Sequence, residues 1–246
     1  MGGCARGGRT QSMHEALKKK LEQAYHILHM EGLAEDTIRG HITTRTEDNR
    51  VYVKPWPLGY EEVTAEDLLC VDLDGNLLEK QGRLHQELAL HLEIYRFRKD
   101  IVSIVHVHPL YSVILSSVFH GKLNIIGQNG MHFGGTIPFY EPVDLIRTKE
   151  QGAALARAMG DKSVLLMRNH GVVTAGRSLE EAVILAIDFE KAAKEHLLAS
   201  TFGRPTEVPP EIVQEMIPKL FDLDQYKMMW DFYTRKRKRR KSPKLT

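Results

Sequence analysis

The chain has 246 residues, of which 42% are hydrophobic and 27% charged, and its formal net charge at pH 7 is +2. A chain of this length and composition buries a sizeable core and forms one medium globular domain or two small ones. No apolar run reaches the length of a membrane span, and the amino terminus lacks the apolar stretch of a secretory signal. Because Cys4 and Cys70 are isolated, we expect no disulfide framework and a cytoplasmic protein.

The two ends of the chain differ in composition from its body. Residues 1–12 are rich in glycine and basic, so we expect a disordered leader, or a true start at Met13 in place of Met1. Residues 235–246 contain the run RKRKRRK, which is typical of a nucleic-acid, membrane or localisation patch, or of a solvated terminus. Since no aromatic residue lies among these charges, we expect a disordered basic tail without a nucleic-acid or membrane partner.

Between these ends, periodicity predicts strands mixed with helices and no strict βαβ rhythm. We therefore predict a single α/β domain at residues 13–205, with a central mostly antiparallel or mixed sheet flanked by helices, and C-terminal helices at 206–234 that pack on the domain or on a neighbouring subunit. In chain order the predicted elements are a helix at 13–31, strands at 38–45, 50–55 and 68–73, a helix at 84–98, a strand at 100–108, a helix at 109–119, a glycine-rich loop with a short strand at 128–142, a helix at 148–160, a strand at 162–167, a turn leading into a strand at 168–176, and a long helix at 179–199.

Histidines lie where two of these strands end. His106 and His108 are two residues apart in a predicted buried strand, so both imidazoles point to the same side, as a metal site on a rigid strand requires. The alternative is a pair of histidines hydrogen-bonded to neighbours. His170 follows another buried strand and precedes a glycine, and Glu87 begins a helix that leads into the first strand. His91, one helical turn after Glu87, is better interpreted as a packing residue or a support for a ligand.

The stretches HQELALHLEIYRFRKDIVSIVHVHP and LLMRNHGVVTAG, followed by the helix after Ser178, resemble the class II aldolase/adducin head family. The resemblance covers about residues 14–200 and rests on a Glu, a His-x-His and a later His-Gly, in that order. It implies a three-layer fold, and a divalent ion in each chain (zinc, manganese, cobalt or iron) bound by His106, His108 and His170. It also implies an acid/base or fourth-ligand role for Glu87, and a homotetramer with active sites between subunits.

The resemblance also implies phosphate-binding positions, which this sequence changes. Sugar-phosphate aldolases of the family have a Gly-Asn-hydroxyl turn, a Ser-Gly pair and a Ser-Ser pair. The corresponding residues here include His41, the pair Leu58–Gly59 and the pair His85–Gln86. Small hydroxyls and free amides suit phosphate, so these replacements disfavour it, although Gly40, Thr43 and Thr44 remain. The adducin heads lack the full metal set that is present here.

The sequence therefore predicts a metal-dependent carbon–carbon lyase. We expect a non-oxidative decarboxylase of a hydroxylated (hetero)aromatic or related carboxylate, acting through a metal-stabilised enolate, with Glu87 moving the proton. The alternatives are an aldolase on a small hydroxy-carbonyl or sugar-phosphate substrate, and a non-enzymatic adducin-like interaction domain. Arg45 has an alternative role in a salt bridge within the sheet, and Trp56 in packing its loop. The candidate substrate-binding residues are His41, Arg45, Trp56, His85 and His132.

Overall fold

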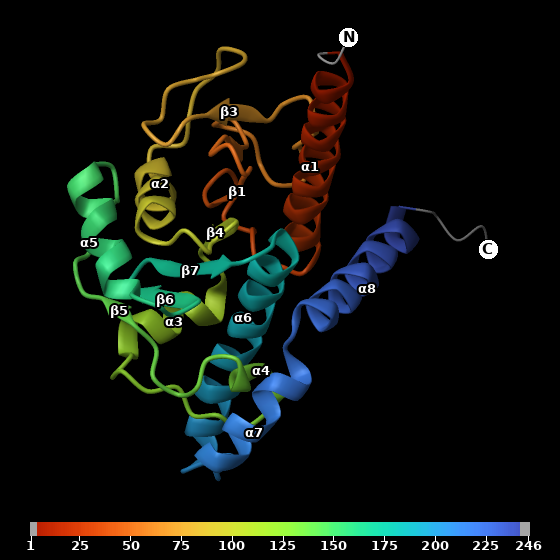
Figure 1. Ribbon diagram of the computed structural model, residues 1–246. Helices are drawn as coiled ribbons and strands as arrows, with labels where there is room; N and C mark the ends of the chain where they lie inside the picture. Colours follow the sequence, from red (N-terminus) through yellow and green to blue (C-terminus); the bar gives the residue numbers. More distant parts are fainter. Residues whose placement is uncertain (1–3, 242–246) are drawn as a thin grey trace.

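A computed structural model describes residues 4–241 of the chain, and the side chains of residues 11–240. Seven described strands form one sheet in the order β3-β2-β1-β4-β7-β6-β5 (Figure 1). Neighbouring strands are antiparallel except for β5 and β6, which are parallel, so the predicted mostly antiparallel, mixed sheet is confirmed. The strands are β1 (His41–Arg45), β2 (Val51–Val53), β3 (Leu69–Val71), β4 (Ser103–Val107), β5 (Phe139–Tyr140), β6 (Val164–Met167) and β7 (Gly171–Gly176).

Helices cover both faces of the sheet and complete three layers (Figure 1). One face packs against α2 and α5, and the other against α1, α3, α6 and α8. None of the described helices is long and apolar enough to cross a membrane. The helices are α1 (Cys4–Met30), α2 (Leu88–Phe97), α3 (Leu110–Val118), α4 (Gln128–Met131), α5 (Lys149–Met159), α6 (Leu179–Phe202), α7 (Pro210–Leu220) and α8 (Leu223–Lys241).

Strand β4 lies at the centre of the sheet and shows how its residues are divided between the two cores. Val105 and Val107 pack into the core of α1, α3 and α6, whereas Ile104 packs into the core of α2 and α5. His106 alternates with Val105 and Val107 and therefore faces the α2 side. Because both faces of the strand are buried, its sequence is an almost continuous run of β-branched residues, as predicted.

The two ends of the chain differ from the prediction of disorder. The described part of the leader belongs to α1, and the described part of the basic tail is the last portion of α8. Charge pairs hold the basic end of α8 against α1: the ammonium of Lys236 lies 2.6 Å from the carboxylate of Glu31, and the guanidinium of Arg237 lies 3.4 Å from that of Glu22. Residues 1–3 and 242–246 of these two predicted segments lie outside the described residues.

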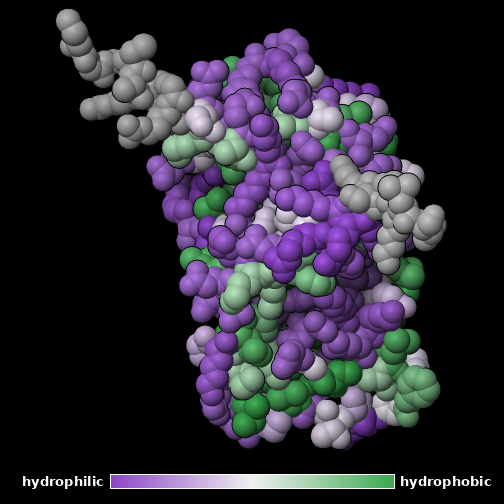
Figure 2. All heavy atoms as spheres, turned by 90° about the vertical axis from the view of Figure 1, so that its right-hand side faces the viewer, coloured by the Kyte–Doolittle hydropathy of each residue, from purple (hydrophilic) through white to green (hydrophobic). Residues whose placement is uncertain are grey.

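Helices α7 and α8 occupy the segment predicted to be helical after the main domain. Trp230 and Tyr233 of α8 are buried and join the core beneath α1 and α6. Figure 2 shows the face that carries α8, where hydrophobic side chains gather towards the lower end. Ile212 of α7 and Met228 of α8 are among the exposed apolar residues, at 42% and 54% exposure.

Candidate metal centre and its pocket

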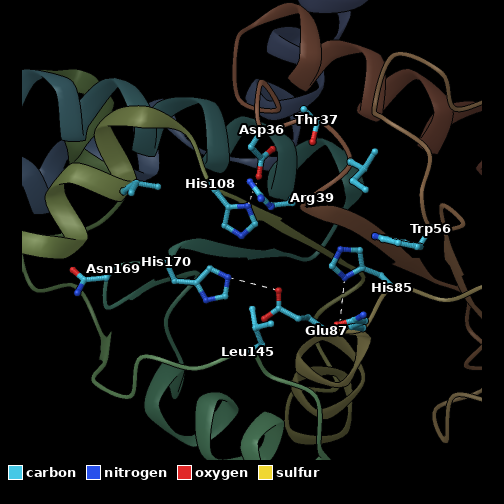
Figure 3. A pocket seen from close by; sticks show the side chains of 13 residues that line it. Asp36, Thr37, Arg39, Trp56, His85, Glu87, His108, Leu145, Asn169 and His170 are labelled. Atoms are coloured by element: carbon cyan, nitrogen blue, oxygen red, sulfur yellow. Dashed lines mark hydrogen bonds and ion pairs between the residues drawn. The ribbon is translucent and has the colours of Figure 1, made fainter.

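A pocket of about 680 Å³ lies where β4 and β6 end and α2 begins (Figure 3). Its walls come from segments far apart in the sequence: the loop before β1, the loop after β2, the start of α2 and the turn after β6. The lining residues are Asp36, Thr37, Ile38, Arg39, Trp56, His85, Gln86, Glu87, His108, Val113, Leu145, Asn169 and His170.

Glu87, His106, His108 and His170 form what we call the metal cluster, in which one ligand atom from each residue lies within 4.8 Å of all the others. The Oε2 atom of Glu87 is 3.6 Å from Nε2 of His170 and 3.9 Å from Nε2 of His106. The Nε2 atoms of His106 and His108 are 3.1 Å apart. The structure thus brings together all four residues that the sequence predicted as ligands or acid/base.

The backbone explains why a glycine follows His170. A Cβ atom at Gly171 would lie 2.5 Å from the carbonyl oxygen of Val107 and 2.7 Å from Cδ2 of His108. Only glycine lets β7 come this close to the end of β4. The turn before it places Asn169 at φ 49°, a left-handed conformation that asparagine tolerates. This close approach is what brings His170 beside His108.

Hydrogen bonds fix which nitrogen of two imidazoles faces the cluster. Nδ1 of His106 lies 3.2 Å from the carbonyl oxygen of Val172, and Nδ1 of His108 lies 2.6 Å from Oδ2 of Asp36. Both partners only accept hydrogen bonds, so each Nδ1 carries the proton and each Nε2 carries a free lone pair. Two lone pairs that face each other at 3.1 Å repel unless a cation lies between them. The donor set therefore fits a divalent metal ion.

Electrostatics favour the neutral form of His106. Burial and the neighbouring His108 lower the pKa of His106 to about 4, so its imidazole is neutral at pH 7, as metal binding requires. Burial acts to raise the pKa of Glu87, but contacts with His106 and His170 outweigh it and hold that pKa below its usual value. Oε1 of Glu87 also accepts a hydrogen bond of 3.0 Å from the amide of Ile146. Glu87 is thus an ionised, oriented carboxylate.

Asp36 lines the pocket and pairs with His108, and the sequence analysis did not predict it. It lies in the loop between α1 and β1, 72 residues before His108, and its side chain is 18% exposed. Contacts with His108 outweigh the effect of burial and lower the pKa of Asp36. No spacing rule connects this loop to the metal cluster, because the pairing arises only when β1 aligns beside β4.

A second group of imidazoles, which we call the histidine stack, lies beside the metal cluster. The ring of His41 lies between those of His85 and His91, with centroids 4.1 Å and 4.2 Å away and planes 25° and 26° apart. His41 and His91 are fully buried, and His41 pairs with His106 across β1 and β4. Burial lowers the pKa of all three, to about 4 for His85, so the rings are neutral at pH 7.

The five predicted substrate-binding residues separate into three groups. Trp56 and His85 line the pocket, whereas His41 lies behind His85 and does not line the pocket. Arg45 lies elsewhere, because its guanidinium donates to the carbonyl of Tyr95 in the last turn of α2 and to those of Lys99 and Ile101 after it. His132 lies beneath α8, where Nε2 is 2.9 Å from Asp188 and Nδ1 is 3.1 Å from the hydroxyl of Tyr226. The structure therefore supplies no substrate contact for Arg45 or His132 within this pocket.

Fold and site together define an α/β domain with a buried histidine–carboxylate metal centre. The family model described as "Class II Aldolase and Adducin N-terminal domain" matches residues 19–197. The chain belongs to this family, and the predicted resemblance is confirmed.

Individual proteins support the same assignment. The chain is 32% identical to a 3,4-dihydroxyphthalate decarboxylase of Arthrobacter keyseri over 219 residues, which cover 84% of this chain and 88% of that protein. It is 32% identical to an L-fuculose phosphate aldolase of Methanocaldococcus jannaschii over 162 residues, covering 65% and 84% of the two chains.

A crystal structure of an aldolase II superfamily protein from Pseudomonas syringae has the same fold, with a TM-score of 0.83 at 23% identity, covering 92% of this chain and 93% of that one. Decarboxylases and aldolases are both lyases. The prediction of a carbon–carbon lyase is therefore confirmed at the level of enzyme class.

Proposed function

We propose that the protein is a divalent-metal-dependent decarboxylase of a hydroxylated aromatic carboxylate. The observation that carries this proposal is that the loop at Leu58–Gly59 has no groups left for a phosphate. The amide of Gly59 donates to the carboxylate of Glu62 at 2.6 Å, so an acid already occupies this donor. The ammonium of Lys54 donates to the carbonyls of Ile38 and Leu58, at 2.8 Å and 2.7 Å. Neither the amide of Gly59 nor the ammonium of Lys54 is left to bind a phosphate at this loop.

The pocket walls suit a flat ring instead. Trp56 and the neutral imidazole of His85 supply aromatic surface, and Val113 and Leu145 supply apolar surface. The guanidinium of Arg83 lies 3.8 Å from the centroid of the Trp56 ring, which holds the indole in place. The related 3,4-dihydroxyphthalate decarboxylase makes an aromatic acid with adjacent hydroxyl and carboxylate groups a reasonable substrate class.

His106, His108 and His170 would hold the metal ion, with Glu87 as acid/base or fourth ligand. When bound, a divalent ion supplies Lewis acidity that stabilises negative charge on a substrate oxygen. Because Glu87 is ionised in the resting site, it first accepts the proton of the substrate hydroxyl. It then gives that proton to the ring carbon whose bond to the carboxylate breaks. Carbon dioxide leaves, and its bonding electron pair stays on the ring carbon as the new C–H bond.

The test is carbon dioxide release by the zinc- and manganese-loaded protein from a panel of ortho-hydroxylated aromatic acids that includes 3,4-dihydroxyphthalate. We expect release with at least one acid, and at least about a thousandfold less from Glu87→Gln loaded with the same metal. Aldol cleavage of a sugar phosphate without release from any acid would overturn the proposal in favour of an aldolase. Actin binding by a protein that takes up no metal would favour an adducin-like role.

We also propose that the enzyme is a cytoplasmic homo-oligomer, a tetramer in the simplest case. The apolar residues Leu110, Ile114 and Val118 follow one face of α3 and are 64%, 41% and 52% exposed. This helix begins two residues after His108, so a subunit packed there would lie beside the pocket. Light scattering of wild type and Ile114→Glu tests it, and a monomeric wild type would contradict it.

A further inference from the structure

Two acids and one arginine are the permanently charged types among the described side chains that line the pocket. Of the described side chains that line it, Arg39 alone carries a permanent positive charge. Asp36 and Glu87 are the two acids, and each is already engaged, Asp36 with His108 and Glu87 with Ile146 and the imidazoles. The positive charge of Arg39 contributes to lowering the pKa of Asp36. Within the described part of the chain, however, no residue accepts a hydrogen bond from the Arg39 guanidinium, and the residue is exposed. Its N–H donors are therefore available to an anion that enters the pocket.

The backbone that carries Arg39 is held on both sides. On one side, the carbonyl of Ile38 accepts the 2.8 Å hydrogen bond from buried Lys54. On the other, Gly40 has φ +66°, and a Cβ there would lie 2.9 Å from the carbonyl oxygen of His106. Thr37 also adopts a left-handed φ of 73°, which is strained for a threonine. These contacts fix the loop against β4 and so hold Arg39 at the rim of the pocket (Figure 3).

The chemistry of decarboxylation decides which group Arg39 binds. A guanidinium on the departing carboxylate would stabilise a charge that disappears as carbon dioxide forms, and would raise the barrier. The departing group is better placed against apolar side chains such as Val113 and Leu145. A cation at the rim therefore suits a carboxylate that remains on the ring. The cation binds such a carboxylate equally well before and during the reaction, so it does not raise the barrier.

We propose that Arg39 binds a second, retained carboxylate, so that the substrate is a hydroxylated aromatic dicarboxylate. The claim that one carboxylate leaves rests on the proposed function, whereas the binding of the other by Arg39 does not. The hydroxyl groups of the substrate would face the metal cluster, its ring would pack against Trp56 and His85, and its retained carboxylate would bind Arg39. Removing that carboxylate or Arg39 should weaken binding by the same factor.

The test compares two ligands that differ only in the retained carboxylate. Isothermal titration of the zinc-loaded protein measures binding of 3,4-dihydroxybenzoate and of catechol. We expect wild type to bind the acid about tenfold or more tightly than catechol, and Arg39→Met to lose that preference while binding catechol as before. Arg39→Lys should keep part of it, because it keeps the charge without the planar fork. Arg157→Met, which removes an exposed arginine of α5 outside the pocket, is the matched control.

Two results would overturn the assignment: no preference for the acid in wild type, or the same preference in Arg39→Met. Kinetics then separate it from the proposed function. For 3,4-dihydroxyphthalate we expect Arg39→Met to raise KM about tenfold or more with kcat nearly unchanged, and to have no such effect on 2,3-dihydroxybenzoate, which lacks the retained carboxylate. If wild type releases no carbon dioxide but its preference for 3,4-dihydroxybenzoate depends on Arg39, the decarboxylase proposal fails and the carboxylate site stands.

Discussion

Two groups of histidines lie side by side on the α2 face of the sheet, and they do different things. In the metal cluster, His106 and His108 each have Nδ1 bound to an acceptor, and their Nε2 atoms converge. In the histidine stack, the rings of His41, His85 and His91 meet face to face, and neither nitrogen of His41 has a hydrogen-bond partner among the described residues. The residue type is the same, so the arrangement of the rings is what distinguishes the groups: in the metal cluster, nitrogen atoms converge on one point beside the Glu87 carboxylate, whereas in the stack the ring faces meet.

Of the substitutions that test this comparison, one in the metal cluster should have the largest effect. His108→Ala removes one of the facing Nε2 atoms, so we expect bound metal to fall from about one ion per chain to almost none. Turnover should fall at least about a thousandfold with it. Metal analysis by mass spectrometry, with Arg157→Met as a control of equal purity, checks the site. Full metal content in His108→Ala would show that His108 is not a ligand.

Lowering the pH should destabilise the metal-free protein through both the metal cluster and the histidine stack. The pKa of His106 is about 4 in the folded chain against 6.5 in the unfolded one, so the unfolded chain binds more protons between these values. Stability therefore falls as the pH drops from about 6.5 to 4, by about 3 kcal/mol for His106 alone. The lowered pKa values of His41, His85 and His91 act in the same direction.

Urea unfolding of the metal-free protein at several pH values between 7.5 and 4 measures this loss. An unfolding midpoint that does not change over this range would contradict the low pKa of His106 and of the stack.

A smaller effect is expected at Asp36, which acts through His108. Asp36→Ala leaves Nδ1 of His108 without its acceptor, so metal affinity should fall about tenfold to a hundredfold. Asp36→Asn keeps an acceptor without the charge and should lose less. Competition with a chelating dye measures both affinities. Wild-type affinity in Asp36→Ala would mean that this hydrogen bond does not orient the ligand.

The smallest effect is expected in the stack. His41→Phe keeps a flat ring and removes two buried nitrogens that have no partner, so stability should change by at most about 1 kcal/mol, in either direction. Metal content should not change. A loss of metal in this variant would mean that His41 belongs functionally to the metal cluster, and would end the distinction between the two groups.

Much of the fold and the centre of the site could be predicted from sequence, because local patterns determine them. The buried strand β4 follows from its run of β-branched residues, and the roles of Glu87, His106, His108 and His170 follow from the resemblance to the class II aldolase/adducin family. Asp36 and Arg39 could not be predicted, because their loop reaches the pocket only through the pairing of β1 with β4. Arg45 shares the α2 face with His41, but it is four residues further along the strand and donates instead to carbonyls at the end of α2 and just after it.

The charge pairs between α8 and α1 also set an order of assembly during synthesis. Glu22 and Glu31 leave the ribosome early, but Arg237 and Lys236, with which they pair, are separated from them by 215 and 205 residues. Glu22 and Glu31 of α1 therefore gain these partners only after residues 236 and 237 have been synthesised. A chain that terminates before residue 236 would lack both pairs between α8 and α1.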